Sequence, residues 1–413
     1  MISFAKINRF SGVIEQVLSS GGNFIFFLWS ARIFDVNQFS EFAVIFTAVQ
    51  MIHGIALQWC FLPIVSYPKN VGNSVVFKIT VKKLIILFSL SPPFLFCYFE
   101  FINPDIIADL SIFKLCIFTA SFIIYDFFKF YLIRISAVIL IIFMHFIKWG
   151  SVMYLLLFYS DTTEIYNVFF VPIVFIVMTV SPYLAYKNSA ENKVDNKIIP
   201  LLETKPLLIQ AVANNVQTFF ITASFLSLNI GLFGAYIAFR SLTNVLPMLM
   251  QYFESHISIS AVNKGEVSIL NNKMYLWIIS LSVVLIVFSF IFRDSIISII
   301  YGENYLVYSY ILPITLTIVV IQSITRLLNV ELRLQSKVKI LYLTSLISIV
   351  SGVGAYSLSL LFDDVFFLLL ILILAPVMQL FVVFVANHVS AYFNDKIRIL
   401  KVISTEILRR LKL

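Results

Sequence analysis

Apolar segments of around 20 residues alternate with short polar linkers along the chain. A helix of that length, rising about 1.5 Å per residue, crosses a hydrocarbon core of about 30 Å. Twelve such segments can be marked, at residues 11–34, 39–67, 77–99, 108–130, 137–160, 165–186, 206–228, 232–257, 274–292, 307–330, 340–361 and 365–388. The pattern predicts an all-α polytopic membrane protein with twelve transmembrane helices.

The composition changes this picture little. Hydrophobic residues make up 61% of the chain and charged residues 12%, and the mean hydropathy is +0.99. An ordinary soluble domain carries about 25% charged residues, so a water-soluble surface cannot be built from this sequence. The three cysteines are spaced neither for a metal site nor for a disulfide framework. We therefore expect no metal and no cofactor.

Charge alternates between successive linkers. Lysines and arginines gather near the N-terminus, in every second linker and in the tail, whereas the remaining linkers carry acidic residues such as Asp161 and Asp363. The positive-inside rule then places both termini in the cytoplasm. The same asymmetry explains the net charge of +8 without a nucleic-acid partner. Residues 389–413 have the pattern of a basic amphipathic helix on the inner membrane surface, with a solvated tail as the alternative.

An internal repeat relates the two halves of the chain. The polar residues of the first span recur in the seventh at a constant offset of 194 residues: Gln16, Ser20 and Asn23 correspond to Gln210, Asn214 and Gln217. Just beyond, residues 34–46 resemble residues 226–239, with a small gap that aligns Phe42 with Phe233. The repeat predicts two six-helix lobes, 1–186 and 206–388, joined by a cytoplasmic linker at 187–205. Substrate is expected between such lobes, near the membrane midplane.

The two polar stripes allow two interpretations. Their i, i+4, i+7 spacing places each set on one helical face. They either line a wet central cleft or form hydrogen bonds between neighbouring helices. Because the stripe recurs in both halves, we favour the cleft.

Several ionisable residues fall inside the predicted spans. An Arg or Lys at the centre of a membrane costs about 2.5–3.5 kcal/mol even on lenient scales, so such residues are expected to face a watery cavity or a partner. Three cations, Lys148, Arg240 and Arg326, have no acidic residue within one helical turn. Cations that line a cleft indicate an anionic substrate, and they suit phosphate groups well. Asp126 and Lys129, three residues apart, either form a local pair or belong to the same cavity. Packing is the expected role of His53 and His145.

A tight turn is predicted within the segment SIISIIYGENYLVYSYILP, residues 295–313. Gly302 can adopt a backbone conformation that other residues avoid. Tyr301 and Tyr305 are expected at the boundary between membrane and water, where amphipathic rings are enriched.

Four stretches resemble motifs of one transporter family. They are SSGGNFIFFLWSARIF leading into FDVNQFSEFAV, then YDFFKFYLIRISAV, NIGLFGAYIAFRSL and IISIIYGENYL. The chain resembles the polysaccharide-exporter branch of the multidrug/oligosaccharidyl-lipid/polysaccharide (MOP) superfamily, and most of all its O-antigen (Wzx-type) flippases. It departs from the family pattern at Phe34, Asp35 and Ser40, and it lacks the two additional spans of the related lipid II flippases.

The resemblance implies a MATE-like V of two six-helix lobes around a cationic cavity in a bacterial inner membrane. It also implies alternating access that carries undecaprenyl-diphosphate-linked oligosaccharide, an O-antigen or capsule repeat unit, to the periplasmic leaflet. Lys148, Arg240 and Arg326, with Lys129, would hold the diphosphate and sugar, and the polar stripes would contact glycan hydroxyls. Asp126 or Glu15 would couple transport to an ion gradient. The partners implied are membrane lipids and the polymerase and chain-length proteins of the same pathway.

Two alternatives remain at this point. An O-antigen polymerase or ligase is expected to carry a long periplasmic loop with catalytic residues, whereas the outer linkers here are short. A MATE-like multidrug exporter would favour acids in its cleft, whereas the unpaired ions here are mainly basic. No G-x-x-x-x-G-K phosphate-binding loop is present, and no catalytic residue is assigned.

Overall fold

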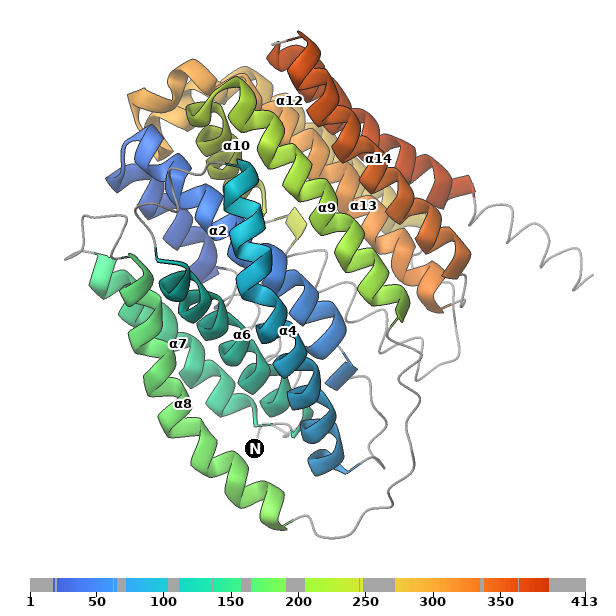
Figure 1. Ribbon diagram of the computed structural model, residues 1–413. Coiled ribbons are helices and arrows are strands. Elements are labelled where there is room, and N and C mark those ends of the chain that lie inside the picture. The colour runs from blue at the N-terminus through green and yellow to red at the C-terminus, as the bar shows by residue number, and fades with distance from the viewer. Residues whose placement is uncertain are drawn as a thin grey trace, which may run out of the picture.

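The computed structural model describes residues 18, 21–61, 63–64, 72–102, 111–135, 137–156, 165–190, 205–244, 246–247, 272–334, 338–362 and 364–385. Within these ranges the regular elements are helices and there is no strand (Figure 1). Six of the described helices are long and apolar enough to cross a membrane. The predicted all-α membrane class is therefore confirmed, while the number of twelve crossings and the lobe boundaries stay predictions.

The helices follow the predicted spans closely. In chain order they are α2 (Val36–Ala56), the π-helical turn η1 (Leu57–Phe61), α4 (Asn73–Ile102), α6 (Ile112–Arg134), α7 (Val138–Leu156), α8 (Ile165–Ala190), α9 (Lys205–Leu228), α10 (Ile230–Thr243), α12 (Asn272–Ile300), the 3₁₀ helix η4 (Glu303–Tyr308), α13 (Ile311–Leu334) and α14 (Val338–Phe362). Residues 21–33 are helical before α2, and a last described helix runs over Val365–Val385. The described part of each predicted span is thus mainly helical, although span 39–67 also contains η1 and span 307–330 begins within η4.

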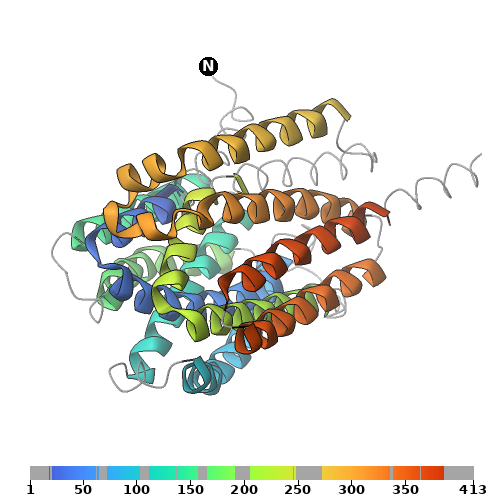
Figure 2. The ribbon, with the colours of Figure 1, turned by 90° about the horizontal axis from the view of Figure 1, so that it is seen from above.

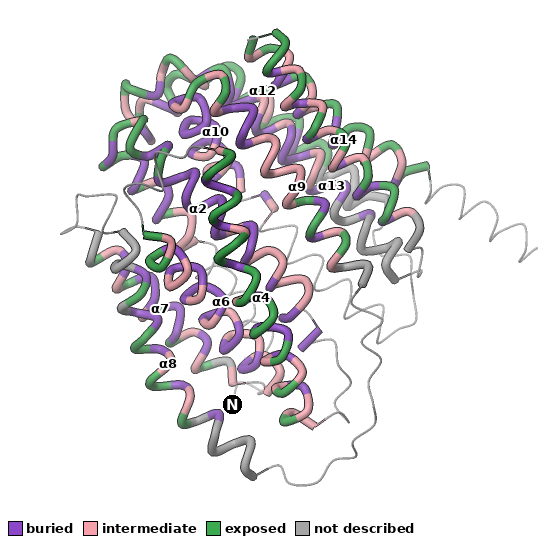
Figure 3. The backbone as a smooth tube through the Cα atoms, in the orientation of Figure 1, coloured by how far each residue is buried: buried purple, intermediate pink, exposed green. Residues whose placement is uncertain are grey.

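Two groups of helices meet at α2 and α10. Helices α4, α6, α7 and α8 pack among themselves and, through α4 and α6, against α2, whereas α9, α12, α13 and α14 lie on the other side with α10 (Figures 1 and 2). Buried positions concentrate along α2 and α10, and the outward faces of α4, α12 and α14 are largely exposed (Figure 3). In a membrane protein such exposed apolar faces contact lipid.

The crossing of α2 and α10 reveals the symmetry of the repeat. Asp35 and Asn229 each begin one of these helices by accepting a hydrogen bond from the backbone three residues on, at Gln38 and Leu232. The two caps are related by the offset of 194 that relates the first and seventh spans. The predicted gap is therefore wrong: Phe39, not Phe42, is the counterpart of Phe233.

Ser40 and Gly234 are also counterparts at this offset, and they touch each other. A Cβ on Gly234 would lie 3.2 Å from Cα of Ser40. Two residues that the predicted repeat relates therefore lie in direct contact. The close approach requires small residues on both helices.

The tight turn after α12 forms as predicted, and its two tyrosines are buried. Gly302 has φ +94°, in the region that favours glycine. Tyr301 and Tyr305 are 3% and 1% exposed, so their rings are packed inside the protein, and their position at the boundary between membrane and water stays a prediction. The Tyr301 hydroxyl donates a 2.7 Å hydrogen bond to the Ala238 carbonyl of α10. Burial raises the pKa of the Tyr301 phenol above its usual range, which keeps it a donor.

Candidate functional site

An ionisable cluster is buried in the N-terminal half, between α2, α6 and α7. Nε2 of His53 lies 2.6 Å from Oδ2 of Asp126, and each side chain is 15% exposed. Lys129 and Lys148 also interact electrostatically with this carboxylate. Asp126 therefore takes an ion-pair partner from another helix, and Lys129 adds an electrostatic attraction from α6 itself. A buried carboxylate requires such compensation.

Lys148 lies in an aromatic box that we define as the rings of Phe122, Tyr125 and Trp149. Its Nζ is 4.8 Å, 4.2 Å and 4.7 Å from the three ring centroids, and the residue is 6% exposed. It makes no hydrogen bond or ion pair within the described part of the chain. Each contact between an ammonium and the face of an aromatic ring contributes about 0.5–2 kcal/mol. The three rings therefore stabilise the Lys148 ammonium without a directly bound anion.

Local helix geometry explains why these groups meet. Phe122, Tyr125, Asp126 and Lys129 follow the i, i+3, i+4, i+7 spacing and share one face of α6. Lys148 reaches across from α7 to that face. Helix α7 also positions Tyr125, because the Tyr125 hydroxyl and Nδ1 of His145 share a 2.6 Å hydrogen bond. His145 thus has the packing role expected for it.

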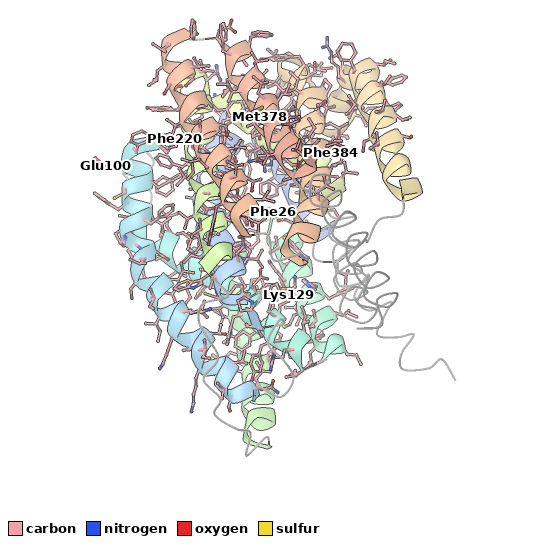
Figure 4. The ribbon with its side chains drawn as sticks, turned by 90° about the vertical axis from the view of Figure 1, so that its right-hand side faces the viewer. Phe26, Glu100, Lys129, Phe220, Met378 and Phe384 are labelled. Carbon is pink, nitrogen blue, oxygen red and sulfur yellow. The ribbon has the colours of Figure 1, made fainter. Side chains whose placement is uncertain are left out.

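The other predicted cations lie elsewhere. Arg240, half-buried on α10, donates from Nη1 to the Tyr236 hydroxyl at 3.2 Å and forms no ion pair with any described residue. Arg326 belongs to α13, but its side chain is not among those described. Figure 4 shows Lys129 among the helices of the N-terminal half. The structure therefore brings Lys129 and Lys148 together and leaves Arg240 in the other half.

The polar stripe of α9 makes hydrogen bonds mainly within its own half. Nε2 of Gln217 donates to Oγ of Ser351 at 3.0 Å. The Ser348 hydroxyl faces Oδ1 of Asn214 at 3.5 Å and accepts a 2.6 Å hydrogen bond from Gln379. We call these five residues the amide–hydroxyl ladder. It favours the interhelical interpretation for Gln217, while Asn214 remains exposed at the edge of the ladder.

Other members of the predicted stripes are less informative. Gln210 is half-buried on α9, and Asn23 is half-buried before α2. Glu15, Gln16 and Ser20 lie outside the described residues. Asn215, next to the stripe, joins the two halves directly, because its Nδ2 donates a 2.6 Å hydrogen bond to the Met51 carbonyl of α2.

Sequence reasoning underestimated two residues. His53 carries the ion pair of Asp126, but 73 residues separate them, so no local spacing indicates the contact. Lys83, inside the predicted span 77–99, is 4% exposed on α4 and donates to the Trp59 carbonyl at 2.9 Å. That carbonyl belongs to η1, where a π-helical turn breaks the regular hydrogen-bond pattern.

Comparison with known proteins identifies the fold. No protein-family model matches the sequence, and no curated protein matches it significantly. A structure titled an inward-facing multidrug resistance MATE family transporter of the MOP superfamily is similar over 93% of this chain and 98% of its own, with a TM-score of 0.60 and 13% identity.

Two further structures agree. The lipid II flippase MurJ, in an inward closed conformation, has a TM-score of 0.62 and 13% identity over 91% of this chain and 87% of its own. The Vibrio cholerae MATE transporter VcmN has a TM-score of 0.54 and 12% identity, over 93% of this chain and 95% of its own. The chain therefore has the fold of MOP-superfamily transporters. It is a multi-pass membrane protein.

Proposed function

We propose that the protein is a flippase that moves undecaprenyl-diphosphate-linked oligosaccharide, an O-antigen or capsule repeat unit, from the cytoplasmic to the periplasmic leaflet of a bacterial inner membrane. Transport proceeds by alternating access between the two lobes. Membrane lipids surround it, and the polymerase and chain-length proteins of the pathway receive its product.

One observation carries the proposal. Lys148 and Arg240 are cations within the helical body that form no ion pair with any described residue. A cation at membrane depth persists when a partner or a cavity compensates it, and it marks a substrate path by default. A diphosphate supplies the missing charge and offers acceptors in pairs to a guanidinium. Arg326 and Lys129 complete the proposed cationic set.

Two further features support a lipid-linked glycan. MurJ, whose fold this chain shares, is named for a lipid-linked substrate. The exposed edge of the amide–hydroxyl ladder at Asn214 provides donors and acceptors of the kind that bind sugar hydroxyls. Gln210 and Gln217 on α9, with Gln16, Ser20 and Asn23 before α2, are proposed to extend this polar surface.

A MATE-like multidrug exporter is the second candidate, because two of the similar structures are MATE transporters. It requires an acid that can meet a cationic drug. Among the described acids of the N-terminal half, Asp126 is the one within the helix packing, and His53 already compensates it. A polymerase or ligase is disfavoured because the similar folds are those of transporters or flippases.

The test is glycan export in a deletion strain complemented with variants. Lys148→Met keeps the length of the side chain and removes its charge, and we expect surface polysaccharide to fall at least about tenfold, the equivalent of roughly 1.4 kcal/mol. Lipid-linked repeat units should accumulate on the cytoplasmic leaflet. Lys114→Met, an exposed cation at the start of α6, is the matched control. Normal export by Lys148→Met and by Arg240→Met, at normal abundance, would remove the basis of the proposal.

A further inference from the structure

Trp149 on α7 carries a buried hydrogen-bond donor that lacks a partner. The side chain is 9% exposed, and its indole Nε1 finds no acceptor among the described residues. A buried donor without an acceptor costs about 1–3 kcal/mol, and such a group indicates a bound water, ion or ligand. Unlike a hydroxyl, an indole N–H cannot rotate towards a nearby carbonyl once its ring is packed.

The Trp149 ring is held from two other helices. A Cβ on Gly22 would overlap the ring, so the first described helix packs directly against it. Phe26 of the same helix and Phe169 of α8 lie 6.3 Å and 6.4 Å from it between ring centroids. Glycine and phenylalanine side chains have no oxygen or nitrogen that could accept the N–H. The indole donor is therefore fixed in place among apolar neighbours.

The indole lies beside a cation that also lacks an acceptor. Nζ of Lys148 is 4.7 Å from the centroid of the Trp149 ring, and within the described part of the chain it forms neither a hydrogen bond nor an ion pair. Asp126 attracts Lys148 electrostatically but accepts no hydrogen bond from it. Two buried donors on consecutive residues thus lie close together, and each requires an acceptor.

The chemistry of the two donors selects the kind of group that satisfies them. A water molecule or a sugar hydroxyl accepts hydrogen bonds, but it also has hydrogens to donate. The oxygens of a phosphate group are strong acceptors, and hydrogen bonds from an ammonium to such an anion are short and strong. Burial excludes bulk water, which strengthens both contacts further.

We propose that Lys148 and Trp149 form a donor pair that binds one phosphate of the lipid-linked diphosphate. The ammonium supplies charge, and the indole N–H supplies one directed hydrogen bond to a phosphate oxygen. Trp149 thus contributes specificity for a phosphate over a neutral hydroxyl group. This inference rests on the proposed function, because it adds a second binding residue to the same cationic site.

The first measurement follows the indole N–H itself. The full chain is labelled with ¹⁵N in its tryptophan indoles and placed in nanodiscs. It contains four tryptophans, and the resonance missing from Trp149→Phe is that of Trp149. Farnesyl diphosphate should shift this resonance downfield, whereas farnesol should leave it in place. The resonance of Trp29, which is 40% exposed on the first described helix, is the internal reference and should not move.

The second measurement removes only the donor. Replacement of Trp149 by β-(3-benzothienyl)alanine keeps the shape of the ring and exchanges the N–H for sulfur. Binding of farnesyl diphosphate at constant pH should weaken about tenfold, because a hydrogen bond to a charged acceptor is lost. Farnesol binding and thermal unfolding should stay as in the wild type. The same replacement at Trp29 is the matched control and should leave both affinities unchanged.

Lys148→Gln separates this inference from the proposed function. The donor pair requires both the shift and the loss of affinity, so a Trp149 resonance that stays in place, or that moves equally with farnesol, would overturn it. Wild-type affinity with the benzothienyl side chain at position 149 would overturn it as well. If Lys148→Gln nevertheless loses farnesyl diphosphate, the flippase proposal stands. No binding of farnesyl diphosphate by the wild type would contradict both proposals.

Discussion

The two halves of the molecule share a helical framework but differ in their polar chemistry. Near the contact of Ser40 with Gly234, the counterparts Phe39 and Phe233 are both buried and apolar. At the same offset of 194 residues, Phe42 and Phe46 of the N-terminal half correspond to Tyr236 and Arg240 of the C-terminal half. The N-terminal half instead buries its ions between α2, α6 and α7. The repeat thus preserves packing, and its charged groups occur where the symmetry is broken.

The buried polar groups of the two halves also differ in kind. The N-terminal half combines an ion pair and an aromatic box with edge-to-face contacts such as Phe26 with Phe169, at 4.8 Å between centroids. The C-terminal half uses the neutral amide–hydroxyl ladder between α9, α14 and the last described helix. Neutral hydrogen bonds join helices at little electrostatic cost, whereas buried charges require compensation and respond to ligands.

The largest effect is expected at the contact between the halves. Gly234→Leu would force side-chain atoms into Ser40 and separate α2 from α10. Overpacking costs about 1–3 kcal/mol in ordinary cores, and here it also disrupts the contact between the two groups of helices. We expect strongly reduced abundance in membranes and a lower unfolding temperature in detergent. Gly150→Leu is the matched control, because no atom lies within 4 Å of a Cβ at that position. Equal effects of the two substitutions would contradict the symmetric contact.

A second prediction exchanges the chemistry of counterparts. Arg240→Phe places in the C-terminal half the residue that the N-terminal half has at Phe46. Because the backbone frameworks correspond, the variant should be produced normally. Surface polysaccharide in complemented cells should fall at least about tenfold, because the variant loses the charge-assisted contact proposed between Arg240 and the substrate diphosphate. Arg293→Phe, at a partly exposed position on α12, should export normally. Reduced abundance of Arg240→Phe would instead indicate that the guanidinium holds the fold.

The smallest effect is expected in the ladder. Gln217→Leu and Ser351→Ala each remove one side of a 3.0 Å hydrogen bond. Side-chain hydrogen bonds between membrane helices contribute about 0.6 kcal/mol on average. A double-mutant cycle on unfolding in detergent should therefore give a coupling of about that size. A cycle with Thr179→Ala on α8 is the control and should give none. Loss of export by Gln217→Leu at wild-type stability would restore the prediction that this residue lines the cleft.

Helix positions could be predicted from the sequence because apolar length is a local property. The positive φ of Gly302 could be predicted because a glycine in a tight turn is also a local signal. The burial of Tyr301 was not, because it depends on the Ala238 carbonyl of a helix distant in sequence. The ion pair of His53 with Asp126 was missed for a similar reason. Lys148 could be recognised as a cation without a local acid, whereas its aromatic box required the packing of α6 against α7.

The central claim, that Lys148 and Arg240 act on a lipid-linked diphosphate, is tested most directly by translocation in reconstituted vesicles. The substrate is the lipid-linked oligosaccharide that accumulates in the deletion strain, labelled on its glycan, and its access to an impermeant quencher is measured over time. The account predicts rapid translocation by the wild type and none above protein-free vesicles by Lys148→Gln combined with Arg240→Gln. Translocation by this double variant at the wild-type rate would contradict the account.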